Sequence, residues 1–390
     1  MAKVRVGVAG VGGMGQGHCE ALLQVKEAKL AAVCDYDAKT AQRVGEKFGV
    51  PCFSDHREMF KAGLLDAVVI ATPHYYHPPI AIDAFRSGLH VLSEKPISVT
   101  VKEADRMIAA AKKSGKVFSV MYQLRNDPKF RAARKLLDEG KVGALIRANM
   151  VLGYYRSQAY YDSGGWRATW KGEGGGVLFN QAPHMLDIFG WLVGRPKYIT
   201  AQTRTRLHDI EVEDEAFARL EYENGAHGYL YASVIEAPTT TRLEIVGDRG
   251  KILIEGEDFK FWELDTPVSK FTRISKEMWS GPRAKLVPVK LERNREATHA
   301  AILRNFCRAI LHGEARLTPG EEGLFSVELA DAITLSSYQK KTVKLPISRP
   351  AYEALMAKLI RQSKPKTRVK EQRITDTVHL KEIREKAKRR

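Results

Sequence analysis

The fold is decided by the stretch VRVGVAGVGGMG at residues 4–15. Its valines alternate with other residues, which predicts a strand, and a glycine-rich turn follows directly. A helical pattern of apolar residues continues through residues 22–25, and a second apolar run at residues 30–34 ends at Asp35. The predicted order is therefore strand, glycine turn, helix and strand, with an acidic residue 20 positions after the last glycine.

This order is typical of the turn that binds dinucleotides. Gly10 permits the tight turn, Gly12 lets bare backbone approach a pyrophosphate, and Gly15 lets the helix pack closely on the strand. Free N–H groups at the helix start would bind the phosphates. Asp35 would accept hydrogen bonds from the ribose 2′-hydroxyl and repel a 2′-phosphate, so we expect NAD, with NADP disfavoured. The alternative is an α/β turn that binds nothing. The expected coenzyme contacts here are Gly10, Gly12, Gly13, Met14, Gly15 and Asp35.

Length and composition describe an ordinary globular protein. A chain of 390 residues exceeds the usual limit for one hydrophobic core, so two domains are expected. No apolar run reaches membrane-spanning length, and the short N-terminal run is explained as a strand, so we predict neither a membrane span nor a signal peptide. The four cysteines are scattered without metal-ligand spacing, which indicates a reducing compartment, and we predict a cytoplasmic protein.

The net charge of +17 is concentrated in part at the C-terminus. Residues 364–390 hold 11 Lys/Arg against 4 Asp/Glu, which gives +7 and leaves +10 for the rest of the chain. Basic tails can bind nucleic acid, but no aromatic-basic interleaving or recognition-helix pattern accompanies this one. We therefore expect a solvated tail, or a helix that docks on another subunit, and no nucleic-acid partner.

The first part of the chain alternates strands and helices. The apolar run at residues 66–71 is expected for a strand buried on both faces of a parallel sheet. Further predicted strands and helices occupy residues 39–48, 55–62, 80–87, 90–92, 101–114 and 117–120. This alternation predicts a doubly wound parallel sheet, in which ligands lie at the carboxyl ends of the strands.

The pattern changes after one further helix at residues 128–140. Candidate strands then follow without alternating helices, at residues 146–154, 198–206, 215–222, 227–233, 242–247 and 251–255. Asn224-Gly225 is a strong hairpin signal between two of them. Strands joined by turns predict a largely antiparallel sheet in an α+β domain, with closing helices at residues 298–312 and 324–337.

Lys95 is the first candidate for chemistry, because Glu94-Lys95-Pro96 follows a predicted strand end. A lysine beside a cationic oxidised nicotinamide should lose its proton more readily, since like charges disfavour ionisation. The alternative is a surface lysine next to a turn. Its place at the carboxyl edge of the sheet favours a functional role.

The second candidate is the segment GGGVLFNQAPHMLD at residues 174–187. On one continuous helix, Asn180, His184 and Asp187 would share a face, and a polar stripe on an apolar helix needs partners such as a substrate. Histidine is the usual general base at neutral pH. The alternative is a buried histidine satisfied by backbone groups. Pro183 disfavours a continuous helix, and if the helix starts only there, Asn180 leaves the stripe.

Aromatic residues crowd the approach to this segment, and among them we expect Tyr155, Trp166 and Arg167 to contact substrate. Such side chains suit the faces and hydroxyls of a sugar-sized polyol, although they would equally suit the core of the second domain. His74 and His77 have a spacing that could suggest a metal. Because no third ligand is nearby, we expect no metal and assign these histidines to loop packing against the coenzyme.

With these motifs in view, the chain resembles the Gfo/Idh/MocA oxidoreductases, the family of glucose-fructose oxidoreductase and inositol dehydrogenase. The matching motifs extend to about Pro346 and are the 10–15 turn, Ala71-Thr72-Pro73 with His77, residues 88–96, Tyr122-Gln123-Leu124-Arg125, residues 174–187, and Ser337-Tyr338 before residues 343–345. Together with the strand ends, they assign coenzyme contacts to Ala71, Thr72, Pro73, His77, Glu94, Lys95 and Gln123.

The resemblance implies a fold of two parts. An NAD-binding Rossmann domain would span residues 1–123, and an α+β domain with a large, mostly antiparallel open sheet would span residues 124–346. That sheet would form one wall of the active site and carry the contacts of a homo-oligomer, a dimer or tetramer. Residues 347–390 would be a basic extension, to which the resemblance assigns no role.

The resemblance also implies an activity, an NAD-dependent dehydrogenation of a CH–OH group in a sugar, sugar derivative or cyclitol. His184 would be the acid/base residue and Lys95 would contact the reacting oxygen. Asn180 stands where many members carry aspartate, which leaves it as a hydrogen-bonding orienter. Two alternatives remain open: a glycosidase that retains NAD and acts by transient oxidation, and a regulator that binds NAD and sugar without turnover. The expected substrate contacts are Lys95, Tyr155, Trp166, Arg167, Asn180 and His184.

Overall fold

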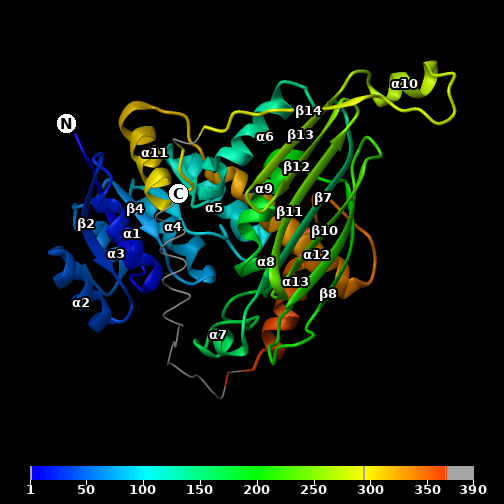
Figure 1. Ribbon diagram of the computed structural model, residues 1–390. Helices are drawn as coiled ribbons and strands as arrows, with labels where there is room; N and C mark the ends of the chain where they lie inside the picture. The colour runs from blue at the N-terminus through cyan, green and yellow to red at the C-terminus, as the bar shows by residue number, and fades with distance from the viewer. Residues whose placement is uncertain (1, 293–294, 365, 367–390) are drawn as a thin grey trace.

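The computed structural model describes residues 2–292, 295–364 and 366. It contains a parallel sheet formed by the N-terminal part of the chain and a larger, mostly antiparallel sheet formed by the rest (Figure 1). The predicted fold class is confirmed. The prediction of a solvated tail or docking helix at residues 364–390 lies almost entirely outside the described residues.

The first sheet has six parallel strands in the order β3-β2-β1-β4-β5-β6. The order reverses between β1 and β4, and such a switch point is where open α/β sheets bind ligands. The strands are β1 (Val4–Ala9), β2 (Ala28–Cys34), β3 (Cys52–Phe53), β4 (Ala67–Ile70), β5 (His90–Ser93) and β6 (Phe118–Val120).

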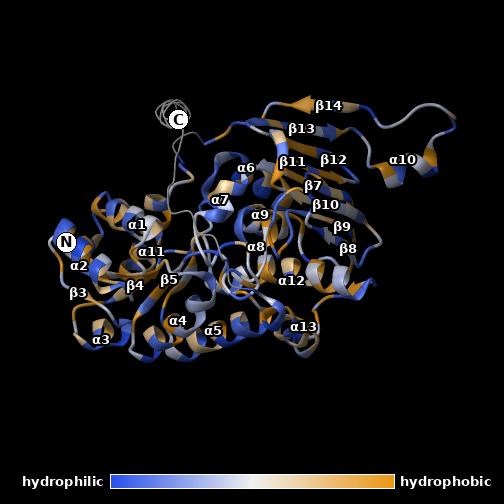
Figure 2. Cartoon of the chain, turned by 90° about the horizontal axis from the view of Figure 1, so that it is seen from below, coloured by the Kyte–Doolittle hydropathy of each residue, from blue (hydrophilic) through white to orange (hydrophobic). Residues whose placement is uncertain are grey.

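Helices cover both faces of this sheet, as its mostly apolar, buried strands require (Figure 2). One face packs against α1 (Gly13–Leu23), α2 (Ala38–Phe48) and α11 (His299–His312), and the other against α3 (His56–Lys61), α4 (His77–Arg86) and α5 (Val101–Ser114). Helix α11, which we expected as a closing helix of the second domain, thus returns to the first sheet and packs on α1.

The second sheet has nine strands in the order β14-β13-β12-β11-β7-β10-β9-β8-β15. Neighbours pair antiparallel except β10 with β7, which are parallel. The strands are β7 (Leu145–Tyr155), β8 (Tyr198–Arg204), β9 (Glu215–Glu221), β10 (His227–Ser233), β11 (Ile235–Gly247), β12 (Gly250–Glu255), β13 (Asp258–Leu264), β14 (Ala284–Val287) and β15 (Val343–Lys344). The sequence prediction missed the last three.

One face of this sheet is packed and the other is open (Figure 1). In β9, Ala216, Ala218 and Leu220 are fully buried, whereas Phe217 between them is exposed. The predicted hairpin joins β9 to β10, with Gly225 at a φ of +81°, in the left-handed region that favours glycine. The alternation expected for a half-solvated antiparallel sheet is therefore present.

The packed face is covered mainly by helices from the C-terminal part of the chain. Helices α8 (Val177–Asn180), α9 (Pro183–Val193) and α12 (Leu324–Gln339) contact its strands. Helix α6 (Pro128–Asp138) packs on α9, and α13 (Arg349–Gln362) packs on α12. Helix α7 (Gln158–Asp162) follows β7, and α10 (Val268–Ile274) projects beyond the sheet (Figure 1). In α13, Tyr352, Met356 and Leu359 are buried, so the start of the basic extension packs on its own chain. No helix in the described part of the chain has the length and apolarity to cross a membrane.

Candidate active site

The glycine turn leaves open space at the start of α1. Gly10 has a φ of +84°, and a Cβ there would lie 2.8 Å from the carbonyl of Ala71. A Cβ on Gly15 would lie 1.8 Å from the carbonyl oxygen of Gly10, so the helix can approach the strand only with glycine there. At Gly12 and Gly13 nothing lies within 4 Å of such an atom. Helix α1 has no side-chain cap, so the N–H groups of its first turn are available to an anion.

Asp35 lies at the end of β2, beside this turn. Its Oδ2 accepts a hydrogen bond of 2.9 Å from the main-chain N–H of Val11, and its Oδ1 accepts one of 3.1 Å from that of Asp37. The carboxylate is therefore held at the mouth of the glycine turn, with acceptor capacity left for a hydroxyl. Met14 is half-exposed on the first turn of α1.

His77 joins the loops that follow β4 and β5. Its Nε2 is 2.8 Å from the carbonyl oxygen of Thr72, and its Nδ1 is 2.8 Å from that of Pro96. Burial lowers the pKa of His77, and a neutral imidazole donates to only one of these two oxygens. Ala71, Thr72 and Pro73 thus form a loop fixed against the end of β5. Within the described ranges, no group of three or more His, Cys, Asp or Glu residues could hold a metal ion.

Glu94 is a buried carboxylate that ties the end of β5 to α1. Its Oε1 lies 2.7 Å from Nε2 of His18, and its Oε2 accepts a hydrogen bond of 3.0 Å from the main-chain N–H of Lys95. Burial opposes ionisation of Glu94, but the hydrogen bond from His18 and the charges of His18 and Lys95 outweigh it and lower its pKa to about 2. His299, at the start of α11, packs edge-on against the His18 ring at 5.1 Å.

Lys95 bridges the two parts of the chain. Its Nζ donates a hydrogen bond of 2.8 Å to the main-chain carbonyl oxygen of Asn180, at the end of α8. Burial lowers the pKa of Lys95, while the negative charges of Glu94 and Glu173 oppose that shift. An ammonium group on the first sheet is thus held against the segment that the sequence also marked for chemistry.

Pro183 divides that segment into two helices. Helix α8 ends at Asn180, and α9 begins at Pro183, whose missing N–H and fixed φ suit a first helical position. The continuous polar stripe of Asn180, His184 and Asp187 is therefore wrong. Asp187 instead forms two buried hydrogen bonds with Arg125, at 2.6 and 2.7 Å.

His184 is partly buried near the junction of the two parts. Neither of its ring nitrogens forms a hydrogen bond among the described residues, and its ring packs edge-on against Tyr122 at 5.9 Å. Burial, and next the positive charge of Lys95, lower the pKa of His184 from 6.5 to about 3. The imidazole is therefore neutral at pH 7 and able to accept a proton.

Asn180 lies in a network with the aromatic loop at residues 156–170. Its Oδ1 accepts a hydrogen bond of 3.2 Å from the hydroxyl of Tyr160, and that hydroxyl accepts one of 2.8 Å from Arg167. The Arg167 guanidinium lies over the rings of Tyr160, at 4.6 Å, and Trp166, at 4.7 Å. Arg167 and Trp166, two of the predicted substrate contacts, are thus linked to Asn180 through Tyr160.

Tyr155 lies elsewhere. It is 54% exposed, and strand alternation in β7 places it on the open face of the sheet, opposite the partly buried Tyr154. The described part of the chain shows no hydrogen bond or ring contact between its side chain and the other predicted site residues.

Several buried polar atoms around this junction lack a protein partner. They include Thr72 Oγ1, beside the glycine turn, and Gln123 Oε1, at the start of the 3-10 helix that follows β6, together with Gln181 Oε1 and His184 Nδ1. Buried polar groups are normally paired, so unpaired ones beside the strand ends of this sheet point to a ligand. With the uncapped α1 and the open space over Gly12 and Gly13, these residues fit a dinucleotide coenzyme.

Some residues of the site escaped the sequence prediction. His18 and Glu173 lie beside assigned motifs and His299 begins α11, but the contacts of all three depend on tertiary packing. Glu173 alone carried a local signal, because it directly precedes the triple glycine at residues 174–176. A buried carboxylate there was not distinguishable from a surface one by sequence.

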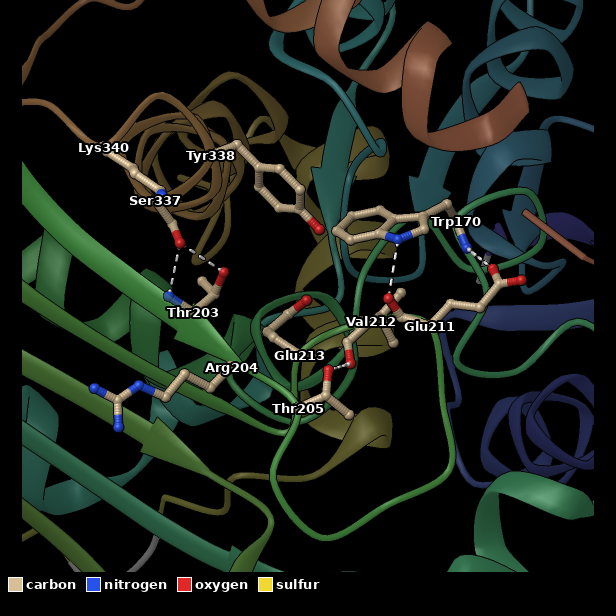
Figure 3. A pocket seen from close by; sticks show the side chains of 10 residues that line it. All are labelled: Trp170, Thr203, Arg204, Thr205, Glu211, Val212, Glu213, Ser337, Tyr338 and Lys340. Atoms are coloured by element: carbon tan, nitrogen blue, oxygen red, sulfur yellow. Dashed lines mark hydrogen bonds between the residues drawn. The ribbon is translucent and has the colours of Figure 1, made fainter. Parts of the chain in front are cut away.

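A separate pocket of about 250 Å³ lies between β8, the end of α12 and Trp170 (Figure 3). Its lining groups largely pair with one another. Ser337 accepts hydrogen bonds from the N–H and hydroxyl of Thr203, and the Trp170 indole donates to the carbonyl of Glu211. None of the predicted site residues lines it, so it is distinct from the junction of Lys95 and His184.

Comparison with known proteins agrees with this geometry. Residues 4–122 match the NAD-binding Rossmann fold of the Gfo/Idh/MocA oxidoreductase family, and residues 130–253 match the family's C-terminal domain. The chain is 28% identical over 258 residues to an inositol 2-dehydrogenase of Rubrobacter xylanophilus, and this match covers 65% of this chain and 71% of that protein. It is 24% identical over 300 residues to the scyllo-inositol 2-dehydrogenase (NADP(+)) IolW of Bacillus subtilis, which covers 72% and 79%.

Among solved structures, the WlbA dehydrogenase from Bordetella pertussis in complex with NADH and UDP-GlcNAcA superposes with a TM-score of 0.76. It is 28% identical, and the match covers 89% of this chain and 100% of that one. The coenzyme turn, the two-part fold and these similarities lead to one conclusion. The chain belongs to the Gfo/Idh/MocA family and is an NAD-binding oxidoreductase.

Proposed function

We propose that this protein transfers a hydride between a secondary hydroxyl of a sugar, a sugar derivative or a cyclitol and a nicotinamide coenzyme. The observation that carries the proposal is the pairing at one junction of a partly buried lysine and a neutral histidine without a hydrogen-bond partner among the described residues. Lys95 reaches across to Asn180, and its charge acts on His184. A base and a cation that meet beside a dinucleotide turn are the groups that alcohol oxidation needs.

The coenzyme would be held by the residues that border the switch point of the first sheet. The N–H groups at the start of α1 would bind the phosphates, and Asp35 would accept from a ribose hydroxyl. Thr72 and Gln123 offer unpaired polar atoms further along the same crevice. When bound, the nicotinamide supplies a hydride acceptor or donor.

The protein's own residues move the proton and stabilise charge. His184 takes the proton of the substrate hydroxyl, because its imidazole is neutral and has no other protein partner. Lys95 donates a hydrogen bond to the same oxygen as negative charge develops on it. Asn180 fixes the position of Lys95 through its main-chain carbonyl.

The substrate class is supported by the aromatic loop. Trp166, Tyr160 and Arg167 combine ring faces with hydrogen-bonding tips beside Asn180, which suits a polyhydroxylated ring. The names of the inositol dehydrogenases and the sugar-nucleotide complex of the structural neighbour agree with this class.

NAD is proposed as the preferred coenzyme. Asp35 places a carboxylate beside the glycine turn, where it would repel a 2′-phosphate. The match to a relative named for NADP(+) shows that sequence similarity at this level does not decide the preference. A direct comparison of the two coenzymes tests the proposal.

We also propose a homo-oligomer that forms through the open face of the second sheet. Phe217 and Tyr229 stack on one another at 6.4 Å and remain 48% and 39% exposed on adjacent strands. An aromatic patch of this kind is typical of a protein interface. A cytoplasmic location is proposed as well, because Cys19, Cys34, Cys52 and Cys307 are all free thiols.

The experiment is to follow NADH absorbance with a panel of sugars, inositols, sugar acids and sugar nucleotides. The proposal predicts NADH formation with at least one member and less with NADP. NAD binding without turnover across the panel would favour a regulator instead. NAD that stays bound while a glycosidic bond is cleaved, with no net NADH, would favour the glycosidase.

A further inference from the structure

Glu173 is a buried carboxylate whose two oxygens are both engaged. It is 1% exposed and lies in the turn between Trp170 and the triple glycine. Its Oε2 accepts a hydrogen bond of 2.6 Å from the main-chain N–H of Ala168, and its Oε1 accepts one from the side-chain amide of Asn180. Because both oxygens accept N–H donors, the contacts suit the ionised form.

The first of these contacts stabilises an uncommon backbone conformation. Ala168 has a φ of +52°, in the left-handed region that residues with a Cβ rarely adopt. The carboxylate therefore holds the loop that carries Trp166 and Arg167 in a shape that this loop would not readily keep alone. Glu173 connects the predicted substrate loop to Asn180.

The second contact determines which way the Asn180 amide faces. A carboxylate accepts only from the amide nitrogen, so the Asn180 oxygen must turn toward the hydroxyl of Tyr160. The main-chain carbonyl of the same residue holds the ammonium of Lys95. An aspartate at position 180 would instead place two carboxylates in contact. The amide is thus the chemical partner that Glu173 requires.

The charges around Lys95 come from several elements. Glu94 from the end of β5 and Glu173 are the anions that act on it, and Arg167 and Arg156 are the cations. The histidine rings on which its charge acts are His74, His77, His184 and His299. Glu173 itself also interacts with Arg167, Tyr161, Glu213 and Lys366. Glu173 is therefore one of two anionic groups in this array that face Lys95.

We propose that Glu173 is a positioning residue for this site, whose carboxylate orients Asn180 and serves as the counter-charge of Lys95. It acts through Asn180, which joins the substrate loop to the lysine. Without Glu173, the Lys95 ammonium faces two arginines and only one carboxylate. The consequence for turnover rests on the proposed dehydrogenase function, whereas the consequence for Lys95 does not.

The test compares four variants with the wild-type chain: Glu173→Gln, Asn180→Asp, the double variant that carries both changes, and Glu211→Gln. The double variant moves the carboxylate from position 173 to position 180 and keeps a complementary amide–carboxylate pair. Glu211 is the matched control, because it also binds the loop at Trp170 but does not act on Lys95. Thermal unfolding checks that each variant is folded.

The first readout needs no coenzyme and no substrate. Lys95 is labelled with acetic anhydride across a pH series and quantified by mass spectrometry, with exposed lysines such as Lys102 as internal standards. We expect the pH midpoint of Lys95 labelling to fall in Glu173→Gln and to return toward the wild-type value in the double variant. Glu211→Gln should match the wild type. An unchanged midpoint in folded Glu173→Gln would overturn the proposal. If Glu173→Gln does not fold, the double variant decides the question. A pH midpoint of Lys95 labelling well below the wild-type value in the double variant would overturn the proposal.

The second readout is turnover with a substrate found in the panel. Glu173→Gln should lower kcat about tenfold or more, the usual effect of losing a hydrogen bond to a charged group, with the KM for NAD unchanged. The double variant should recover most of that loss. A wild-type chain that oxidises nothing would contradict the proposed function and leave the Lys95 titration as the decisive result for Glu173. Loss of turnover that the double variant does not recover would contradict the positioning role.

Discussion

The chemistry depends on what burial does to individual residues. His184 and Lys95 lie in the same low-dielectric junction, and burial favours the neutral form of each. For His184 the charge of Glu94 opposes this shift only in part, so the imidazole is neutral and has a nitrogen free to accept a proton. For Lys95, Glu94 and Glu173 oppose the shift, so a positive charge can be retained beside the histidine. A proton acceptor and a hydrogen-bond donor thus arise from neighbouring groups in one environment.

His184→Ala is expected to abolish most turnover and to leave coenzyme binding intact. A positioned general base contributes about 10²- to 10⁴-fold, so kcat should fall by that order. The Kd for NAD, measured by fluorescence titration, should change far less than kcat, because the coenzyme's phosphate and ribose contacts at the glycine turn do not involve His184. Turnover at the wild-type rate would show that the base is a different residue.

Asp35→Ala should weaken NAD binding and leave turnover at saturating NAD nearly intact, the reverse of His184→Ala. The variant loses the charged acceptor of a hydrogen bond from the ribose hydroxyl, which weakens binding by about 10- to 100-fold. The Kd for NAD should therefore rise, while kcat at saturating NAD changes little. The ratio of kcat/KM for NAD to that for NADP should fall, since the repulsion of a 2′-phosphate is removed. Asp37→Ala, which alters a neighbouring carboxylate at the N-terminus of α2, is the control. Equal effects from both variants would contradict the role of Asp35.

At the scale of elements, close approach rather than loop flexibility explains the glycine turn. Gly15 touches the carbonyl of Gly10, whereas Gly12 and Gly13 border empty space. The close approach at Gly15 lets α1 pack on β1, whereas the open space at Gly12 and Gly13 leaves room for the ligand. The same motif therefore contains positions with different physical roles.

Three alanine substitutions separate these roles. Gly15→Ala should destabilise the fold by about 1–3 kcal/mol or more, because its Cβ overlaps a backbone oxygen. Gly13→Ala should leave the thermal midpoint unchanged and weaken NAD binding, since its Cβ enters the space for the phosphates. Gly17 lies further along α1, and a Cβ there also meets nothing. Gly17→Ala should therefore keep both the stability and the NAD affinity, and should stabilise the helix slightly. Equal NAD affinity in the Gly13 and Gly17 variants would contradict the assigned phosphate site.

Hydrophobic periodicity and turn residues predicted most helices and strands from short stretches of sequence. The 2.0 and 3.6 periodicities located β7 to β12 and most helices, and Asn224-Gly225 marked the β9–β10 hairpin. Strands β14 and β15 were missed because they pair only at the two edges of the finished sheet. Strand β13 was missed although its sequence alternates and it follows β12 through a two-residue turn. The break between α8 and α9 could be stated only as a condition on Pro183.

At the scale of the whole molecule, the site is a junction between distant segments. Lys95 and Asn180 are 85 positions apart in the chain, and the helix at residues 299–312 returns to cover the first sheet. Sequence motifs identified Lys95, Asn180 and His184 individually. Glu173 and His18 lie beside these motifs in the sequence, but their roles are defined by side-chain contacts that only the folded molecule makes.

Buried neutral histidines also predict how stability depends on pH. Burial lowers the pKa of both His74 and His184 from 6.5 to about 3. Between these values the unfolded chain binds more protons at these two histidines than the folded chain does, so their contribution to stability falls as the pH drops below 6.5. Each histidine should cost about 2 kcal/mol at pH 5. Buried carboxyl groups such as Glu213, whose pKa burial raises to about 7, act in the opposite direction, so the contribution of His74 is isolated by comparison with a variant. Chemical denaturation at pH 7 and pH 5 measures the change in stability, and His74→Gln should lose less, or gain more, than the wild type. An identical change in both would contradict a buried neutral His74.

The central claim is that a nicotinamide ring binds between Lys95 and His184. The most direct measurement is a crystal structure of the protein grown with NADH. The claim predicts pyrophosphate density at the start of α1 and the nicotinamide ring in contact with both the Lys95 ammonium and the His184 imidazole. A coenzyme bound with its nicotinamide away from these two side chains, or with either side chain turned from the ring, would contradict it.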